Sequence, residues 1–233
     1  MEKVPIGIPE LDSLLRGGLP KNGICLVAGG PGTGKTILGA QFLYYGATKY
    51  NEPGVLVSFS ENTKRFIGYM LELGWDFQKL VKEKKVAILD MVSTKSGAID
   101  ETLSSMFEKV HEIGAKRLVV DSVSAIILAN ESKIDTRIVV SLLHKALERA
   151  DCTTILITET PWGSTGIGTG VEEFVGDGII LMETFVQGSE FKRRLAIPKM
   201  RGADHDTRRY TYLITKANGI SIIPYPCLLY TSD

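Results

Sequence analysis

Gly29-Gly30-Pro31-Gly32-Thr33-Gly34-Lys35-Thr36 is the most informative segment of this 233-residue chain. It fits the pattern G-x-x-x-x-G-K-[ST], whose glycines let the backbone curl so that its N–H groups point at phosphate oxygens. An apolar run, residues 23–28, precedes it, and residues 36–49 follow with the apolar spacing of a helix. These flanks favour a phosphate-binding loop (P-loop) over a Gly-rich turn with an exposed lysine, and the helix start adds its dipole.

The polar side chains of the loop have separate expected roles. Lys35 would reach the β- and γ-phosphates, which makes it catalytic as well as binding, and the Thr36 hydroxyl would ligate Mg²⁺. The segment therefore predicts that the chain binds ATP and Mg²⁺. The nucleotide contacts expected here come from Gly30, Pro31, Gly32, Thr33, Gly34, Lys35, Thr36 and Ile37.

On either side of the loop, apolar runs alternate with helical patterns as far as Pro161. Strands are expected at 54–59, 86–89, 117–121 and 153–158, and helices at 62–73, 99–113 and 138–147. This alternation predicts an α/β fold with a mostly parallel sheet covered by helices on both faces. After Pro161 the pattern changes to hairpin strands that extend the sheet edge, expected at 178–185, 193–199, 209–215 and 220–223.

Length and composition limit the function classes. The chain suits one large domain, expected at residues 1–226, with a tail at 227–233. Lys plus Arg and Asp plus Glu both number 27, so no overall charge draws the protein to nucleic acid or to a membrane. Three separated cysteines, no signal peptide and no apolar run of about 18 residues favour a reduced, cytoplasmic setting.

Two carboxylates follow apolar strands at the edge where the P-loop is expected. Asp121 closes the run Arg117 to Asp121, where it could hold Mg²⁺; alone, it would be only a strand terminus. Glu61 follows the strand at 54–59 and is a candidate catalytic base. Its alternative role is that of an acid at a helix N-terminus.

Several further segments, in this order and spacing, resemble the KaiC-like group of the RecA/RadA ATPase superfamily. The resemblance spans residues 6 to about 223. Beside the P-loop its marks are Ile6-Gly7-Ile8-Pro9, Leu11-Asp12, Gly17-Gly18-Leu19-Pro20, Gly74-Trp75-Asp76, Val119-Val120-Asp121-Ser122, Val171-Glu172-Glu173-Phe174, Lys199-Met200-Arg201-Gly202 and His205.

The resemblance implies a RecA-type core and a ring, commonly hexameric, with ATP and Mg²⁺ between subunits. It implies that Lys199 and Arg201 reach the neighbour's phosphates as catalytic groups supplied in trans. Without the resemblance they would be charges on an edge hairpin. Met200, His205 and Thr215 fall at further nucleotide-contact positions, and Arg193 and Arg194 remain unassigned.

This chain departs from the family pattern at three places. Relatives usually carry two adjacent glutamates where this chain has Ser60-Glu61, so hydrolysis is less secure than binding. The Ser-Thr pair of the autophosphorylating KaiC half is replaced by Glu173-Phe174, which argues against autokinase activity. Ala203 and Lys216 replace a hydroxyl and an acid at two minor nucleotide-contact positions.

Other candidate residues favour structural interpretations. His111 and His144 have no spaced metal-ligand partner, so both are interpreted as structural or surface residues. Trp162 opens a Gly-rich loop at the place where recombinase relatives contact DNA. Residues 163–170 contain no Lys or Arg, however, which favours a linker.

The leading hypothesis is an ATPase whose cycle drives a conformational or assembly change, in a regulatory or signalling role. A nucleotide-gated binding scaffold with little turnover is the second, and Ser60 favours it. A DNA-handling ATPase of the recombinase type is the third, and the balanced charge argues against it. The expected partner is a second copy of the chain, and a further protein partner stays unidentified.

Overall fold

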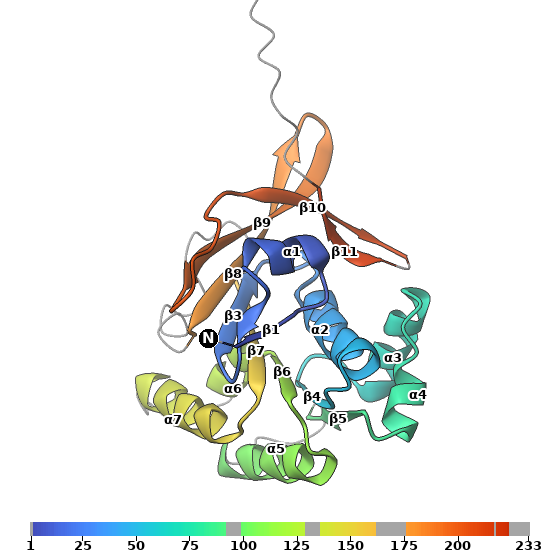
Figure 1. Ribbon diagram of the computed structural model, residues 1–233, viewed down its shortest axis with the longest axis vertical. Coiled ribbons are helices and arrows are strands. Elements are labelled where there is room, and N and C mark those ends of the chain that lie inside the picture. Colours follow the sequence, from blue (N-terminus) through green and yellow to red (C-terminus); the bar gives the residue numbers. More distant parts are fainter. Residues whose placement is uncertain (1, 92–98, 129–135, 162–175, 217, 224–233) are drawn as a thin grey trace, which may run out of the picture.

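The computed structural model describes residues 2–91, 99–128, 136–161, 176–216 and 218–223 (Figure 1). Four expectations therefore lie outside the described residues. These are the loop that begins at Trp162, the Val171 to Phe174 motif, Cys227, and the tail at 227–233.

A nine-stranded mixed sheet forms the centre of the described fold, in the order β11-β10-β9-β8-β3-β7-β6-β4-β5. The six strands from β8 to β5 are parallel, as the near-continuous apolar runs predict. Their bounds are β3 Ile24–Gly29, β4 Gly54–Ser58, β5 Val86–Asp90, β6 Arg117–Asp121, β7 Thr153–Glu159 and β8 Gly178–Gln187.

Helices cover both faces of these strands (Figure 1). Because side chains alternate along a strand, Cys25 and Val27 of β3 face one core and Ile24 and Leu26 face the other. The first core includes α2 (Lys35–Lys49), α3 (Thr63–Glu72) and α4 (Phe77–Lys82). The second includes α5 (Ile99–Ile113), α6 (Val123–Leu128) and α7 (Thr136–Arg149). The predicted α/β class is confirmed.

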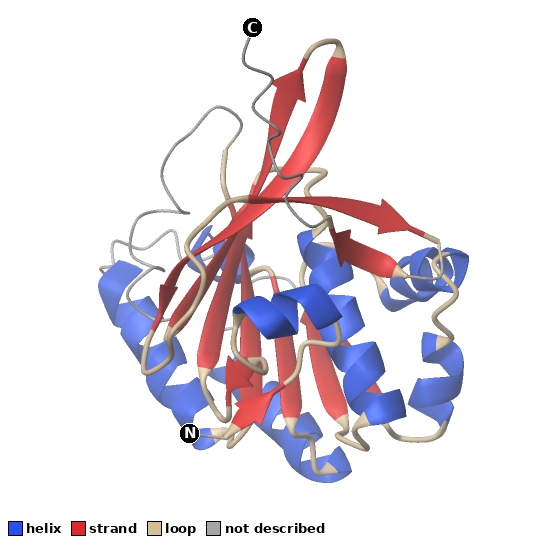
Figure 2. Ribbon diagram, turned by 45° about the horizontal axis from the view of Figure 1, so that its top comes forward, coloured by secondary structure: helices blue, strands red, loops and turns tan. Residues whose placement is uncertain are grey.

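The C-terminal strands are antiparallel, as predicted: β9 is Glu190–Met200, β10 Tyr210–Thr215 and β11 Gly219–Ile222. Strands β8 and β9 are longer than the sequence pattern indicates, and their hairpin projects beyond the parallel strands (Figure 2). Beyond Met182, β8 no longer pairs with β3, so only β9 continues beside it.

An N-terminal arm, residues 3–20, was not predicted as regular structure. It comprises β1 (Lys3–Val4), α1 (Pro9–Leu14) and β2 (Leu19–Pro20), and β1 pairs with β2. Arg117 attaches the arm to the sheet, because its buried guanidinium donates to the carbonyls of Pro5 and Phe42 at 2.9 and 2.8 Å. The Glu52 carboxylate balances its charge at 2.7 Å.

Candidate phosphate-binding site

The P-loop joins the end of β3 to the start of α2. Gly32 and Gly34 have φ angles of +78° and +91°, which side chains other than glycine rarely adopt. At Gly34 a Cβ atom would also lie 2.5 Å from the Ile214 side chain of β10. The loop is therefore curled as its sequence predicts, with the N-terminus of a 15-residue helix directly behind it.

Lys35 is held inside this loop. Its Nζ donates to the Gly30 carbonyl at 3.0 Å. Burial lowers the pKa of Lys35, while the carboxylates of Glu159 and Asp121 act in the opposite direction. Bound phosphate would offer the ammonium a stronger acceptor than a carbonyl.

Thr36 and Asp121 meet at the base of the loop. The Thr36 Oγ1 donates to Asp121 Oδ2 at 2.6 Å, which brings the end of β6 to the start of α2. Burial raises the pKa of Asp121, and the bond from Thr36 and the charge of Lys35 oppose this shift. A hydroxyl and a carboxylate are the oxygen donors that Mg²⁺ prefers, so Thr36 and Asp121 are suited to hold it together.

Glu61 lies beyond the end of β4, where Ser58 fixes its backbone. Ser58 Oγ accepts from the Glu61 N–H at 3.3 Å and donates to the Glu61 carbonyl at 2.7 Å. Glu61 Oε2 is buried and has no hydrogen-bond partner among the described residues. Because Ser58 of β4 pairs with Asp121 of β6, Glu61 lies at the same edge of the sheet, and its charge contributes to the raised pKa of Asp121.

Glu159 is a third carboxylate at this edge. It ends β7 directly beside Gly29, the last residue of β3. Its backbone N–H donates to Ser124 Oγ at 3.0 Å. Glu159 had no role in the leading sequence hypothesis, although its position after an apolar run is the same signal that marks Asp121.

Two side chains contact the P-loop from the C-terminal strands. Arg193 Nε of β9 donates to the Gly32 carbonyl at 3.0 Å, and Tyr212 Oη of β10 donates to the Thr33 carbonyl at 2.5 Å. Neither residue has a role that the sequence pattern predicts, because 161 and 179 positions separate the partners and no motif joins them.

Lys199 and Arg201 lie toward the other end of β9, away from the P-loop of their own chain. Lys199 pairs with Ile179, which pairs with Leu26, three residues before β3 ends. The Arg201 N–H donates to Asp177, whose own N–H donates to Ile24. At about 3.3 Å per residue, Lys199 and Arg201 lie roughly 10 and 16 Å from the end of β3, measured along the strands.

The remaining predicted nucleotide contacts divide between the P-loop side of the sheet and the end of β9 that carries Lys199. Thr215 follows Ile214, which packs against Gly34, so it lies on the P-loop side. Met200 adjoins Lys199 at the end of β9. In the following loop, which contacts α1 through Asp206, the His205 Nε2 is buried without a partner among the described residues. One chain therefore does not bring all the predicted contacts to one nucleotide.

Lys199 and Arg201 both have local acceptors in this chain. Lys199 Nζ donates to the Gly176 carbonyl at 2.8 Å, and Arg201 lies 3.8 Å from the Asp177 carboxylate. The Arg201 side chain is 56% exposed, so its contact with Asp177 is weak and water can replace it.

Both histidines interpreted as structural or surface residues lie on helices. His111 is exposed near the end of α5, and His144 lies 3.7 Å from Glu148 within α7. The described residues contain no cluster of three His, Cys, Asp or Glu side chains suited to a metal ion. In the same part of the chain, no helix combines the length and apolar character needed to cross a membrane.

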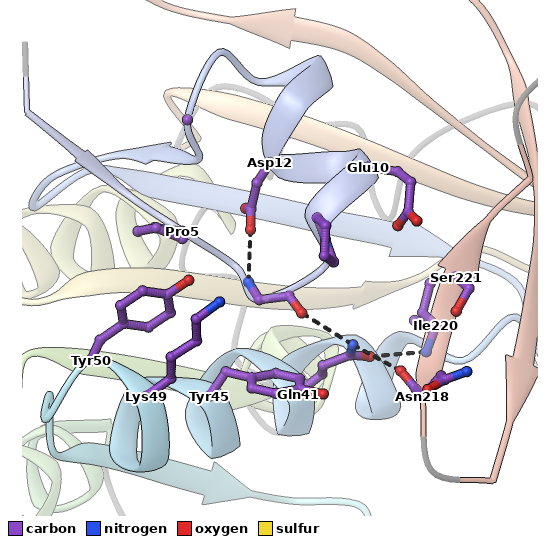
Figure 3. Close-up of a pocket in the computed structure, with 13 residues that line it drawn as sticks. Pro5, Glu10, Asp12, Gln41, Tyr45, Lys49, Tyr50, Asn218, Ile220 and Ser221 are labelled. Carbon is purple, nitrogen blue, oxygen red and sulfur yellow. Dashed lines mark hydrogen bonds between the residues drawn. The ribbon is translucent and has the colours of Figure 1, made fainter.

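A separate cleft of about 600 Å³ lies between the N-terminal arm, the C-terminal half of α2, and β11 (Figure 3). Gln41 closes its base: its amide donates to the carbonyls of Gly7 and Asn218 and accepts from the Ile220 N–H. Asp12 accepts from two backbone N–H groups of the arm. None of the predicted site residues lines this cleft, so it is distinct from the phosphate site.

Comparisons of the sequence and of the structure with known proteins give matches that agree with one another. The family model "ATPase: KaiC" matches residues 4–226. The UPF0273 protein MJ1359 of Methanocaldococcus jannaschii is 36% identical over 97% of both chains. The circadian clock oscillator protein KaiC of Thermostichus vulcanus is 34% identical over 99% of this chain, which spans 46% of that protein. The crystal structure of a KaiC-like protein, PH0186 of Pyrococcus horikoshii OT3, superposes with a TM-score of 0.88 at 39% identity, over 96% of this chain and 99% of that one.

Proposed function

Because this chain belongs to the KaiC-like ATPase family, we propose that it is a Mg²⁺-dependent ATPase that works as a ring, hexameric by the family pattern, with nucleotide between subunits. The observation that carries the proposal is the 2.6 Å contact between Thr36 and Asp121, with Lys35 beside it in the curled loop. It joins the two oxygen ligands that Mg²⁺ bound to a nucleotide requires. We also propose residues 1–226 as one ATPase domain, supported by the family match to residues 4–226.

The chemistry follows from the residues at this edge. The N–H groups of the loop and the Lys35 ammonium bind and orient the phosphates, while Thr36 and Asp121 would hold Mg²⁺. Mg²⁺, when bound, neutralises the charge that develops on the phosphate oxygens. The buried Oε2 of Glu61, which has no hydrogen-bond partner in the described part of the chain, is suited to orient the attacking water and accept its proton.

The register of β9 supports the ring. Lys199 and Arg201 lie too far from the P-loop of their own chain to contact the same phosphates. On a neighbouring subunit they would supply positive charge to the transferred phosphate. The regulatory role is supported only by the clock proteins among the relatives.

A scaffold that holds ATP with little turnover is the second candidate. Ser60 favours it, because relatives carry a second glutamate there. In that case wild-type protein would bind ATP and release phosphate very slowly, and Ser60→Glu would raise the rate.

Phosphate release from purified protein at saturating ATP separates the two candidates. For an ATPase we expect slow turnover that depends on Mg²⁺ and on Glu61, whereas a scaffold would show phosphate release that depends on neither. Glu61→Gln should lower the turnover by about 10²-fold or more while ATP affinity stays within about twofold, because the amide keeps the size and loses the base.

Lys35→Ala should abolish ATP binding, measured by calorimetry, without changing the fold. Turnover that survives Glu61→Gln would remove Glu61 from the mechanism, and unchanged affinity in Lys35→Ala would refute the site.

A further inference from the structure

The outward-facing carbonyls of the P-loop are hydrogen bonded by the C-terminal strands. Arg193 Nε lies 3.0 Å from the Gly32 carbonyl, and Tyr212 Oη lies 2.5 Å from the Thr33 carbonyl. Tyr212 is only 1% exposed, whereas Arg193 is partly open to solvent. Two antiparallel strands thus contact the middle of a loop that is anchored at one end by β3 and at the other by α2.

These two carbonyls belong to the peptide groups that would bind phosphate. The Gly32 carbonyl shares its peptide group with the Thr33 N–H, and the Thr33 carbonyl shares its group with the Gly34 N–H. A trans peptide is planar and its C=O and N–H point in opposite directions. A donor on the outer carbonyl therefore directs the N–H to the inner side of the loop.

Arg193 brings a positively charged donor to the Gly32 carbonyl. Its cationic donor polarises the Gly32–Thr33 peptide, and hydrogen bonds in series strengthen one another, so the Thr33 N–H becomes a better donor to an anion. Tyr212 supplies only a neutral hydroxyl to the next peptide.

The adjacent arginine has a different environment. Arg194 bonds the Glu183 carboxylate at 2.9 Å, and its guanidinium lies 5.0 Å from the centre of the Phe185 ring. Successive side chains of a strand point to opposite faces, so only one of the two arginines faces the P-loop. Arg194 is therefore a matched control in residue type, strand and exposure.

We propose that Arg193 is a positioning residue of the phosphate site. It acts in its own subunit by holding and polarising the Gly32–Thr33 peptide from the outer side of the loop. The ligand class is a polyphosphate, whether the phosphates of ATP or free pyrophosphate. The inference rests on the proposed function for the identity of the site and adds a residue that the family resemblance leaves unassigned.

The test compares Arg193→Met, Arg193→Lys and Arg194→Met as full-length proteins. Calorimetry measures the affinity of each for a non-hydrolysable ATP analogue and for pyrophosphate. We expect Arg193→Met to weaken both ligands about fivefold, since the contact is partly exposed and its strength is limited. Arg193→Lys should recover part of the loss, because its ammonium can donate to the same carbonyl. Arg194→Met should bind as wild type does.

Unfolding midpoints of the free proteins separate positioning from general stability. The inference requires that Arg193→Met melts no lower than Arg194→Met, which also loses the ion pair to Glu183, while only Arg193→Met loses affinity. Equal affinity in all three variants, or an equal loss in Arg194→Met, would overturn it. If the loss appears for the ATP analogue but not for pyrophosphate, Arg193 contacts another part of the nucleotide and the proposal is wrong. Wild-type protein that binds neither ligand would instead refute the proposed function itself.

Discussion

Lys35 combines burial with a charge that the site needs. Among the described residues, its ammonium lies near the Gly30 carbonyl and within the field of Glu159 and Asp121. Burial is the largest influence and lowers its pKa from the usual value of 10.5. Phosphate oxygens would favour the charged form, so the pKa of Lys35 in a nucleotide complex would lie above that in the free protein.

ATP affinity should therefore fall at alkaline pH. The bound-state pKa is the higher one, so the stabilisation by Lys35 is complete below the free-state pKa and is lost as pH rises through the bound-state pKa. The decline is at most about tenfold per pH unit. Calorimetry at a series of pH values from about 7 to 10 checks this.

Lys3 provides the control for this pH dependence. Burial also lowers its pKa, yet it lies in β1 of the N-terminal arm and not in the P-loop. Lys3→Met should leave the alkaline decline in affinity unchanged. An affinity that stays constant through the alkaline range in wild-type protein would contradict the role given to Lys35.

At the level of elements, the start of α3 positions Glu61. The Asn62 side chain caps the helix by accepting from the Arg65 N–H at 3.0 Å. In the same way, Asp76 caps α4 by accepting from the Lys79 N–H at 2.8 Å. Only the first cap adjoins a candidate catalytic residue, so the two helices allow stability and activity to be separated.

Asn62→Ala and Asp76→Ala should each lower the free energy of unfolding by about 1 kcal/mol, because each leaves a helix N–H without its cap. Urea denaturation measures this. Phosphate release should fall severalfold only in Asn62→Ala, since only that substitution loosens the segment carrying Glu61. Equal effects of both substitutions on turnover would show that the cap serves stability alone.

Much of the element pattern could be predicted from sequence. The strand Arg117–Asp121 and the helix Ile99–Ile113 have the predicted bounds, because apolar periodicity runs through each of them. The elements that were missed, β1, β2, α1, α4 and α6, have two to six residues, too few to show a period. The strand extensions toward the tip of the β8–β9 hairpin depend on pairing between strands rather than on local pattern.

The candidate site also has a part that the sequence predicts and a part that only the structure reveals. The P-loop and the position of Asp121 at a strand end follow from contiguous sequence. The contacts of Arg193 and Tyr212 follow from how the antiparallel strands cross the loop, which no local spacing encodes.

At the scale of the whole molecule, β9 places Lys199 and Arg201 away from their own P-loop. Lys199 and Arg201 are the finger residues that a subunit would supply to its neighbour. If ATP lies between subunits, a Lys35→Ala subunit keeps its finger residues and an Arg201→Ala subunit keeps its P-loop. Each variant alone should be nearly inactive, since fingers supplied in trans contribute on the order of 10³–10⁵ in rate.

Mixing the two variants should restore part of the phosphate release, because some interfaces then combine an intact loop with an intact finger. Arg201→Ala alone should keep the ATP affinity of the wild-type subunit. Capture of an untagged variant by a tagged copy of the other establishes that the two variants assemble together. Co-assembled mixtures that remain inactive would refute the shared site.

The position of β3 at the centre of the sheet has a consequence for how the chain is made. Its partners on both sides, β7 and β8, come from residues 153–187, whereas β3 itself ends at Gly29. The ribosome adds roughly 5–20 residues per second, so the emerging chain carries this wholly apolar strand for about 7–30 s before the second partner appears. During translation the strand that leads into the P-loop is thus the segment most in need of a chaperone, and a chain truncated before Gly178 would leave one edge of β3 unpaired and prone to aggregate.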